Sequence, residues 1–137
     1  MVAHFDELET RDPSAREEAL FSALPGFLKA SAGAIEGFAR WLGDVDPESV
    51  TDRAALAKLP VLRKAELMRL QAENPPFGGF ADPKALHGKH VFLSPGPLWE
   101  PEGAGIDPGA AARAFFAVGI RPGDIVHNAF AYHMTPG

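Results

Sequence analysis

The segment at residues 92–103, FLSPGPLWEPEG, combines features that favour and oppose phosphate binding. Its small residues and glycines are typical of a loop between a strand and a helix, where backbone N–H groups often hold phosphate. However, its three prolines each lack a backbone donor, and its two glutamates repel anions with no lysine to offset them. The composition leaves three interpretations open: a phosphate-binding loop, a disabled one, and a simple turn.

Three polar side chains form a second candidate site. Tyr132, His133 and Thr135 follow or end a predicted strand over residues 125–132, and ligands of open α/β sheets gather beyond the carboxyl ends of the strands. An aromatic face beside a titratable imidazole suits an aryl carboxylate. A packed loop whose tyrosine covers the core explains the same residues, so both interpretations stay open.

Other residues that could bind a metal ion, act as a base or bind a phosphate are better interpreted as surface or core residues. His87 and His90 have a spacing that suits a metal ion, but no third ligand lies close in sequence, so they are interpreted as surface histidines. His127 is interpreted as a hydrogen-bonded core histidine rather than a catalytic base. A loose basic patch is interpreted as a solvated helix face; its members are Lys58, Arg63, Lys64 and Arg69.

The elements that would position these residues form the pattern strand, loop, helix, turn, strand over residues 90–132. HVFLS at 90–94 is predicted to be a buried strand. Asp107 and Pro108 have the form of a helix start, because a capping carboxylate precedes a proline at the first helical position. This helix is expected to end at Gly119, before the strand at 125–132. The order predicts the beginning of a layered α/β sheet.

A helical segment precedes this pattern. Asp12 and Pro13 repeat the helix-start signal. Pro25 predicts a kink or a restart, and Gly43 is the expected C-terminal cap, so a helical hairpin and one bent helix are both open. A buried stripe is predicted from leucines that recur every four residues; these are Leu20, Leu24 and Leu28.

The connection between these two regions contains shorter predicted elements. A helix capped by Thr51 is expected to run to Leu59, where Pro60 ends it, and a second helix is expected at residues 64–73, with Leu67 and Leu70 on its inner side. PPFGGF, at residues 75–80, is predicted to be a rigid turn held to the core by its phenylalanines.

The bulk composition excludes several classes of protein. The chain has 137 residues, 46% of them hydrophobic and 23% charged, which is ordinary for a folded soluble domain. Its net charge of -5 gives no reason to expect nucleic acid or a membrane surface as a partner. Because the chain has no cysteine, a disulfide framework and a thiol nucleophile are excluded. Without a signal-peptide pattern, a cytoplasmic protein is expected.

The order and spacing of five segments resemble the N-terminal region of the phenylacetate-CoA ligases, which are adenylate-forming (AMP-binding) enzymes. The resemblance covers essentially the whole chain, and its most specific pieces are PFGGF and RPGDIVH. The five segments are FDELETRD (5–12), LPVLRKAEL (59–67), PPFGGF (75–80), RPGDIVH (121–127) and FAYHMTPG (130–137).

The resemblance implies an ATP- and Mg²⁺-dependent acid–thiol ligase. A carboxylic acid would attack the α-phosphate of ATP to form an acyl-AMP, and coenzyme A would then displace AMP. The residues that resemble the phosphate loop are Ser94 and Gly96, whereas Glu100 stands where the family has a lysine. The residues corresponding to Tyr132, His133 and Thr135 lie near the acyl pocket of that family.

The resemblance also implies an α/β fold in which residues 1–74 form a helical segment and residues 75–137 begin the large nucleotide-binding domain. Because two strands cannot make a stable sheet alone, the chain is expected to be the front part of a longer enzyme and to be inactive by itself. Two alternatives stay open: a non-catalytic helical interaction module, and an adenylating enzyme that loads a carrier protein. The substrate acid and the oligomeric state, a homodimer included, are not specified.

Overall fold

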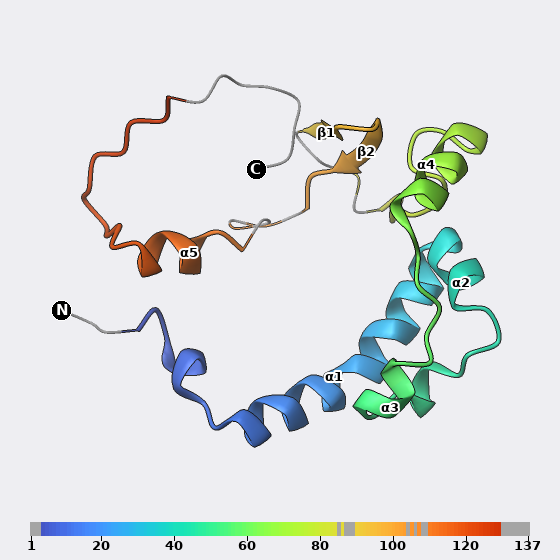
Figure 1. The fold of residues 1–137 in the computed structure, drawn as a ribbon, viewed down its shortest axis with the longest axis horizontal. Helices are drawn as coiled ribbons and strands as arrows, with labels where there is room; N and C mark the ends of the chain where they lie inside the picture. Colours follow the sequence, from blue (N-terminus) through green and yellow to red (C-terminus); the bar gives the residue numbers. More distant parts are fainter. Residues whose placement is uncertain are drawn as a thin grey trace.

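The computed structural model describes residues 4–84, 86, 90–103, 105, 107 and 110–129, and it combines helices with a small antiparallel sheet. The chain follows an open arc, in which α5 and the N-terminal segment lie on the side opposite α4 (Figure 1). The elements are η1 (Glu7–Thr10), α1 (Pro13–Ala34), α2 (Glu36–Leu42), η2 (Pro47–Ser49), α3 (Arg53–Leu56), α4 (Lys64–Glu73), β1 (Val91–Ser94), β2 (Leu98–Pro101) and α5 (Ala112–Ala117).

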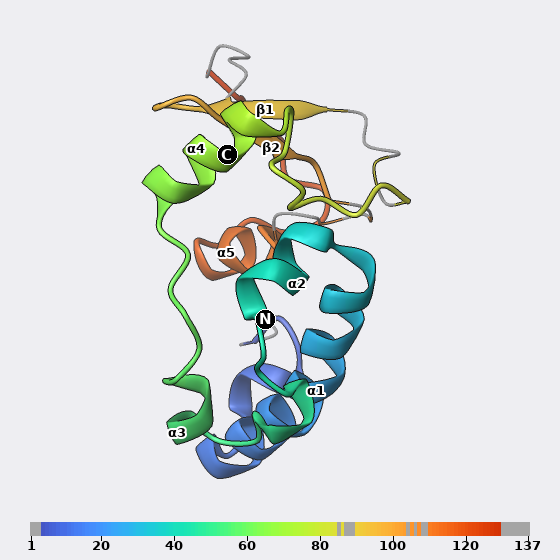
Figure 2. The ribbon, with the colours of Figure 1, turned by 90° about the vertical axis from the view of Figure 1, so that its right-hand side faces the viewer.

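The helix-start signal at residues 12–13 is confirmed. The Asp12 carboxylate accepts hydrogen bonds from the backbone N–H groups of Ser14, at 2.8 Å, and Ala15, at 3.3 Å. Pro25 lies inside α1 and does not end it. The chain instead turns at Ile35, so α2 packs beside the end of α1 (Figure 2), and Gly43 caps α2 with φ of 62°. The N-terminal region is therefore a long helix followed by a short one.

The predicted leucine stripe is correct at one end of α1 and wrong at the other. Leu28 is buried, whereas Leu20 is 62% exposed. The elements that pack most extensively on α1 are α2 and η2. A four-residue repeat shows which side chains share a face, but burial also needs a neighbouring element to cover that face.

Helix α4 has the predicted bounds, whereas α3 is shorter than expected and begins differently. Asp52, not Thr51, caps α3, because its carboxylate accepts the Ala55 N–H at 2.7 Å. Leu67 and Leu70 are only half-buried, and the most buried residue of α4 is Gln71.

The PPFGGF turn joins α4 to the start of α2. Gly79 accepts a hydrogen bond from the Gly37 N–H at 2.8 Å. A Cβ atom on Gly37 would lie 2.8 Å from backbone atoms of Gly79 and from the Phe80 ring. Gly78 and Gly79 both have positive φ, of 64° and 81°. Glycine is needed at these three positions because two backbone segments touch there.

The sheet is a two-stranded antiparallel hairpin. The predicted strand at 90–94 is confirmed as β1, which pairs with β2 in the register Leu93↔Trp99 and Ser94↔Leu98. Its predicted burial is wrong except at Ser94, because Val91 is exposed and the two residues between them are half-buried. Residues 125–129 form no strand, which corrects the strand predicted at 125–132 over its described part. Ile125 is 99% exposed and no described strand lies beside it. An isolated extended segment has no partner for its backbone hydrogen bonds, so it does not form a sheet.

The buried apolar side chains of the described residues are few and fall into two groups. Leu28, Leu42 and Val50 lie in α1, in α2 and beside η2, whereas Leu98 lies in the hairpin that packs on α4. The accessible surface is 10518 Å². A compact monomer of 14.6 kDa would expose about 6,900 Å². The chain thus buries much less surface than an independent domain of its size.

None of the described helices is both long enough and apolar enough to cross a membrane.

Candidate functional site

The FLSPGPLWEPEG segment is a β-hairpin. Residues 95–97 form the turn between β1 and β2. The predicted strand-to-helix loop is therefore wrong, because the chain returns as a strand after the turn. Gly96 has φ of 107°, a conformation that favours glycine. Among the three interpretations of this segment, its backbone geometry is that of a turn braced by Pro95 and Pro97.

The two residues matched to the phosphate loop lie on this turn in different environments. Ser94 is buried at the end of β1, and its hydroxyl approaches the Leu98 carbonyl at 3.5 Å. Gly96 is exposed at the tip. Because prolines flank it on both sides, Gly96 carries the only backbone N–H between Ser94 and Leu98. The turn itself therefore offers an anion a single backbone donor.

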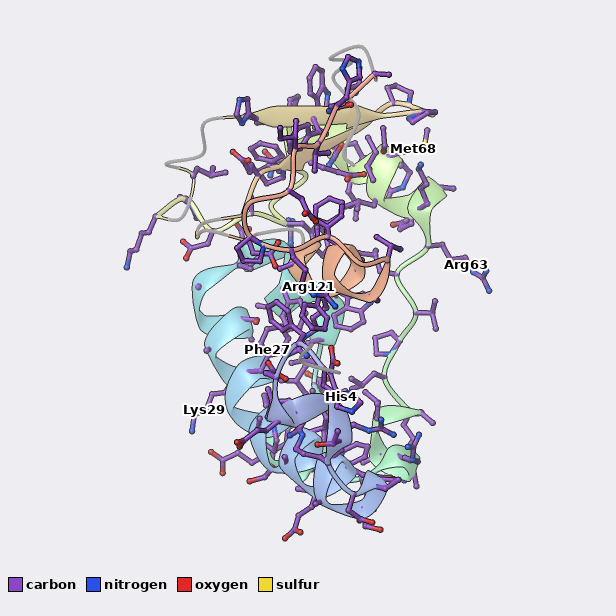
Figure 3. All side chains as sticks on the ribbon, turned by 90° about the vertical axis from the view of Figure 1, so that its left-hand side faces the viewer. His4, Phe27, Lys29, Arg63, Met68 and Arg121 are labelled. Atoms are coloured by element: carbon purple, nitrogen blue, oxygen red, sulfur yellow. The ribbon has the colours of Figure 1, made fainter. Side chains whose placement is uncertain are left out.

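A lysine from α4 reaches the turn. The Lys64 ammonium donates a hydrogen bond to the Pro95 carbonyl at 3.0 Å. Lys64 Cε and Met68 Sδ each lie 3.9 Å from the position that a Cβ of Gly96 would occupy. Figure 3 shows Met68 beside the hairpin and Arg63 directed into solvent. The predicted basic patch is thus not one solvated face, because Lys64 contacts the hairpin whereas Arg63 points into solvent. No spacing within the sequence indicated the contact of Lys64.

Two glutamates, Glu100 on β2 and Glu102 directly after it, add negative charge to the hairpin. Glu100 is half-buried and pairs across the sheet with Phe92. Glu102 lies 2.9 Å from the His90 Nδ1 atom, so one of the two glutamates already has a partner. A carboxylate near a phosphate would weaken its binding by electrostatic repulsion. The described hairpin does not by itself form a triphosphate site.

The hairpin is fixed to α4 through an amide group. Gln71 is 6% exposed, its Nε2 donates to the Trp99 carbonyl, and its Oε1 accepts the Trp99 N–H, both at 2.8 Å. The side-chain amide therefore takes the place of a neighbouring strand along the outer edge of β2. Trp99 itself is 42% exposed, so this attachment is made by its backbone.

The remaining candidates are separate from the hairpin turn. Tyr132, His133 and Thr135 lie outside the described residues, as does His87. His90 pairs with Glu102, and no group of three His, Asp or Glu side chains among the described residues is arranged for a metal ion. His127 is exposed, so its interpretation as a core histidine is wrong.

A shallow cavity of about 400 Å³ lies on α1. Its rim is charged, and Glu17 accepts a hydrogen bond from the Arg53 guanidinium at 2.6 Å, which lowers the pKa of Glu17. No local pattern of residues indicated this cavity, because Thr51 reaches it from a different segment. It is lined by Glu17, Glu18, Phe21, Ser22, Pro25 and Thr51.

A charge reversal at Glu100 tests whether the hairpin turn lies near phosphate. If it does, Glu100→Lys in the complete protein will raise the affinity for ATP, because a repulsive charge becomes attractive. Isothermal titration with ATP measures the change, and Glu18→Lys on α1 is the matched control. Equal ATP affinity in the wild type and in Glu100→Lys would show that the turn lies away from the phosphates.

No protein-family model, curated protein or solved structure gives a match to this chain. Its functional interpretation therefore depends on its own residues, on their arrangement and on the resemblance of its five segments to a known family.

Proposed function

We propose that this chain is the N-terminal part of an ATP-dependent acyl- or aryl-CoA ligase of the phenylacetate-CoA ligase type. The observation that carries the proposal is the ordered set of five segments that resemble this family, from FDELETRD to FAYHMTPG. Within the proposal, residues 1–74 are the helical segment and residues 75–137 begin the nucleotide-binding domain. The enzyme works in the cytoplasm.

The positions of these segments support the proposal. PPFGGF connects α4 with α2, and LPVLRKAEL leads into α4. RPGDIVH begins with a turn in which the Asp124 carboxylate accepts the Arg121 N–H at 2.7 Å. The described segments thus lie where elements are joined, so their residue types are restricted by backbone geometry and close contacts. Such restrictions are what a family-specific motif requires.

The exposed surface gives a second line of support. Ile125, Val126 and Val118 are largely exposed although they are apolar and β-branched. Such side chains gain stability when another part of a protein covers them. In the proposed enzyme, further strands and helices of the same domain cover this surface.

The proposed reaction has two steps. A carboxylate oxygen attacks the α-phosphorus of ATP and releases pyrophosphate, which leaves an acyl-AMP. The thiol of coenzyme A then attacks the acyl carbon and releases AMP, which leaves a thioester. The described residues do not form a magnesium site or a complete phosphate site, so we assign neither step to them. Ser94, Gly96, Tyr132, His133 and Thr135 remain predictions from the resemblance.

The product of the second step shows whether coenzyme A or a carrier protein accepts the acyl group. We expect the complete enzyme, supplied with ATP, Mg²⁺, coenzyme A and an aryl or short acyl acid, to release an acyl-CoA thioester and AMP that mass spectrometry identifies. Formation of acyl-AMP without thioester would instead favour transfer to a carrier protein.

The second candidate function is a non-catalytic helical interaction module. The exposed apolar side chains of α1 and α5, such as Phe27 and Phe115, favour it because they could contact a partner protein. This candidate predicts no nucleotide chemistry with any acid. The two candidates therefore differ in one measurable product, pyrophosphate.

A further inference from the structure

The N-terminal segment binds α5 across more than a hundred residues of sequence. The Arg113 guanidinium donates to both carboxylate oxygens of Asp6, one of them at 3.0 Å, and to Glu9 at 3.2 Å. Two carboxylates therefore share one guanidinium, in the paired geometry that arginine favours. Asp6 also accepts the Leu8 N–H at 2.9 Å, so the same side chain caps η1.

Aromatic rings extend the contact. The Phe5 ring meets the Phe116 ring edge to face, with centroids 5.7 Å apart and planes at 78°. Arg113 lies 5.0 Å from the Phe5 centroid, and Arg121 lies 3.6 Å from the Phe116 centroid. Both distances are within the range of cation–π attraction. The aromatic pair and its two arginines thus form one cluster that joins the N-terminal segment to α5.

Arg121 is held in place independently of the N-terminal segment. Its guanidinium donates to the carbonyl of Phe116, at 2.7 Å, and to that of Ile120, at 2.9 Å. Figure 3 shows Arg121 on the side of α5 that faces the N-terminal segment. Arg121 and Phe116 are therefore held together by the backbone at α5, without help from the N-terminal segment. The N-terminal segment adds the contacts of Phe5, Asp6 and Glu9.

The contact is ionic and partly solvated. The side chains of Arg113 and Asp6 are 41% and 37% exposed, so dissolved salt reaches the pair and weakens it. Hydrogen bonding from Arg113 lowers the pKa of Asp6. A contact of this kind can open without unfolding the elements on either side.

We propose that residues 5–9 form a releasable strap, which covers Phe116 on α5 when closed and uncovers it at high ionic strength. The closed state is held by the Arg113–Asp6 pair, assisted by Glu9 and Phe5. Opening leaves α5 with its own Arg121 contacts. The strap is a property of this part of the chain and does not depend on the proposed ligase activity.

A double-mutant cycle tests the strap in the full chain. The variants are Asp6→Asn, which keeps an oxygen to cap η1, Arg113→Gln, and the two combined. Hydrogen exchange of the amides at residues 115–119 reports opening indirectly, because α5 unfolds locally more often when the strap no longer covers it. We expect each single variant to speed exchange about three- to five-fold. The combined variant should be no faster than Arg113→Gln alone, because removing the guanidinium already removes its interaction with Asp6.

Salt provides a second measurement that needs no variant. Raising sodium chloride from low to high concentration should speed exchange at residues 115–119 in the wild type by a similar factor, and much less in the variants. Lys29→Gln, which removes an exposed ion pair with Glu48, is the control and should leave these amides unchanged. Unchanged exchange in both single variants, or independent and multiplying effects in the combined variant, would overturn the proposal.

Discussion

Replacing Gly37 by alanine will lower the free energy of unfolding by about 2–3 kcal/mol. The new Cβ would lie 2.8 Å from the Gly79 carbonyl group and from the Phe80 ring. Because one of these neighbours is backbone, it cannot rotate away, and the 2.8 Å hydrogen bond from Gly37 to Gly79 would be strained. Urea denaturation followed by tryptophan fluorescence measures the change.

The matched control for this substitution is Gly26→Ala on α1. Gly26 lies inside a helix and has open space where a Cβ would be placed. Alanine at such a position stabilises a helix by about 0.5–1 kcal/mol. The two glycine-to-alanine changes should therefore have opposite signs. A neutral or stabilising effect of Gly37→Ala would mean that the PPFGGF turn is not packed against α2.

Replacing Gln71 by methionine will destabilise the protein by about 2–3 kcal/mol, because the part-buried N–H and carbonyl groups of Trp99 lose their partners together. Methionine keeps the length of the side chain, so the loss of packing is small. The Trp99 N–H and carbonyl would both be left unpaired against α4. Denaturation measures the stability, and the fluorescence of Trp99 would shift as the hairpin separates from α4.

Ala72→Gln serves as the control for Gln71→Met, because Ala72 is exposed on the same helix. A surface substitution of this kind changes stability by at most about 0.5 kcal/mol. If Gln71→Met were as mild as Ala72→Gln, the two 2.8 Å hydrogen bonds would contribute nothing to the attachment of the hairpin.

Local signals in the sequence predicted the parts of the fold that depend on neighbouring residues. Asp12 and Pro13 begin α1, and the bounds of α4 are as expected. These predictions succeed because caps and helical periodicity act within a few residues. The short strand at 90–94 also forms, since its composition favours extended backbone.

The predictions that were wrong concern features that depend on residues far apart in the sequence. The partner of β1 is β2 rather than a strand beyond α5, which no local pattern indicates. The contacts of Lys64 with Pro95 and of Gln71 with Trp99 span about thirty residues. Leu20 is 62% exposed because it lies on a face of α1 that none of the described elements covers. The sequence thus identified the turn at residues 94–98 as notable, but not the side chains that surround it.

The most direct test of the proposed function is acid-dependent exchange between ATP and labelled pyrophosphate. This exchange reports the first half-reaction alone, so it needs neither coenzyme A nor a carrier protein. With the complete enzyme and Mg²⁺, we expect label to enter ATP only when a suitable aryl or short acyl carboxylate is present. Absence of exchange across a broad panel of such acids, with a folded enzyme, would contradict the assignment to the adenylate-forming enzymes.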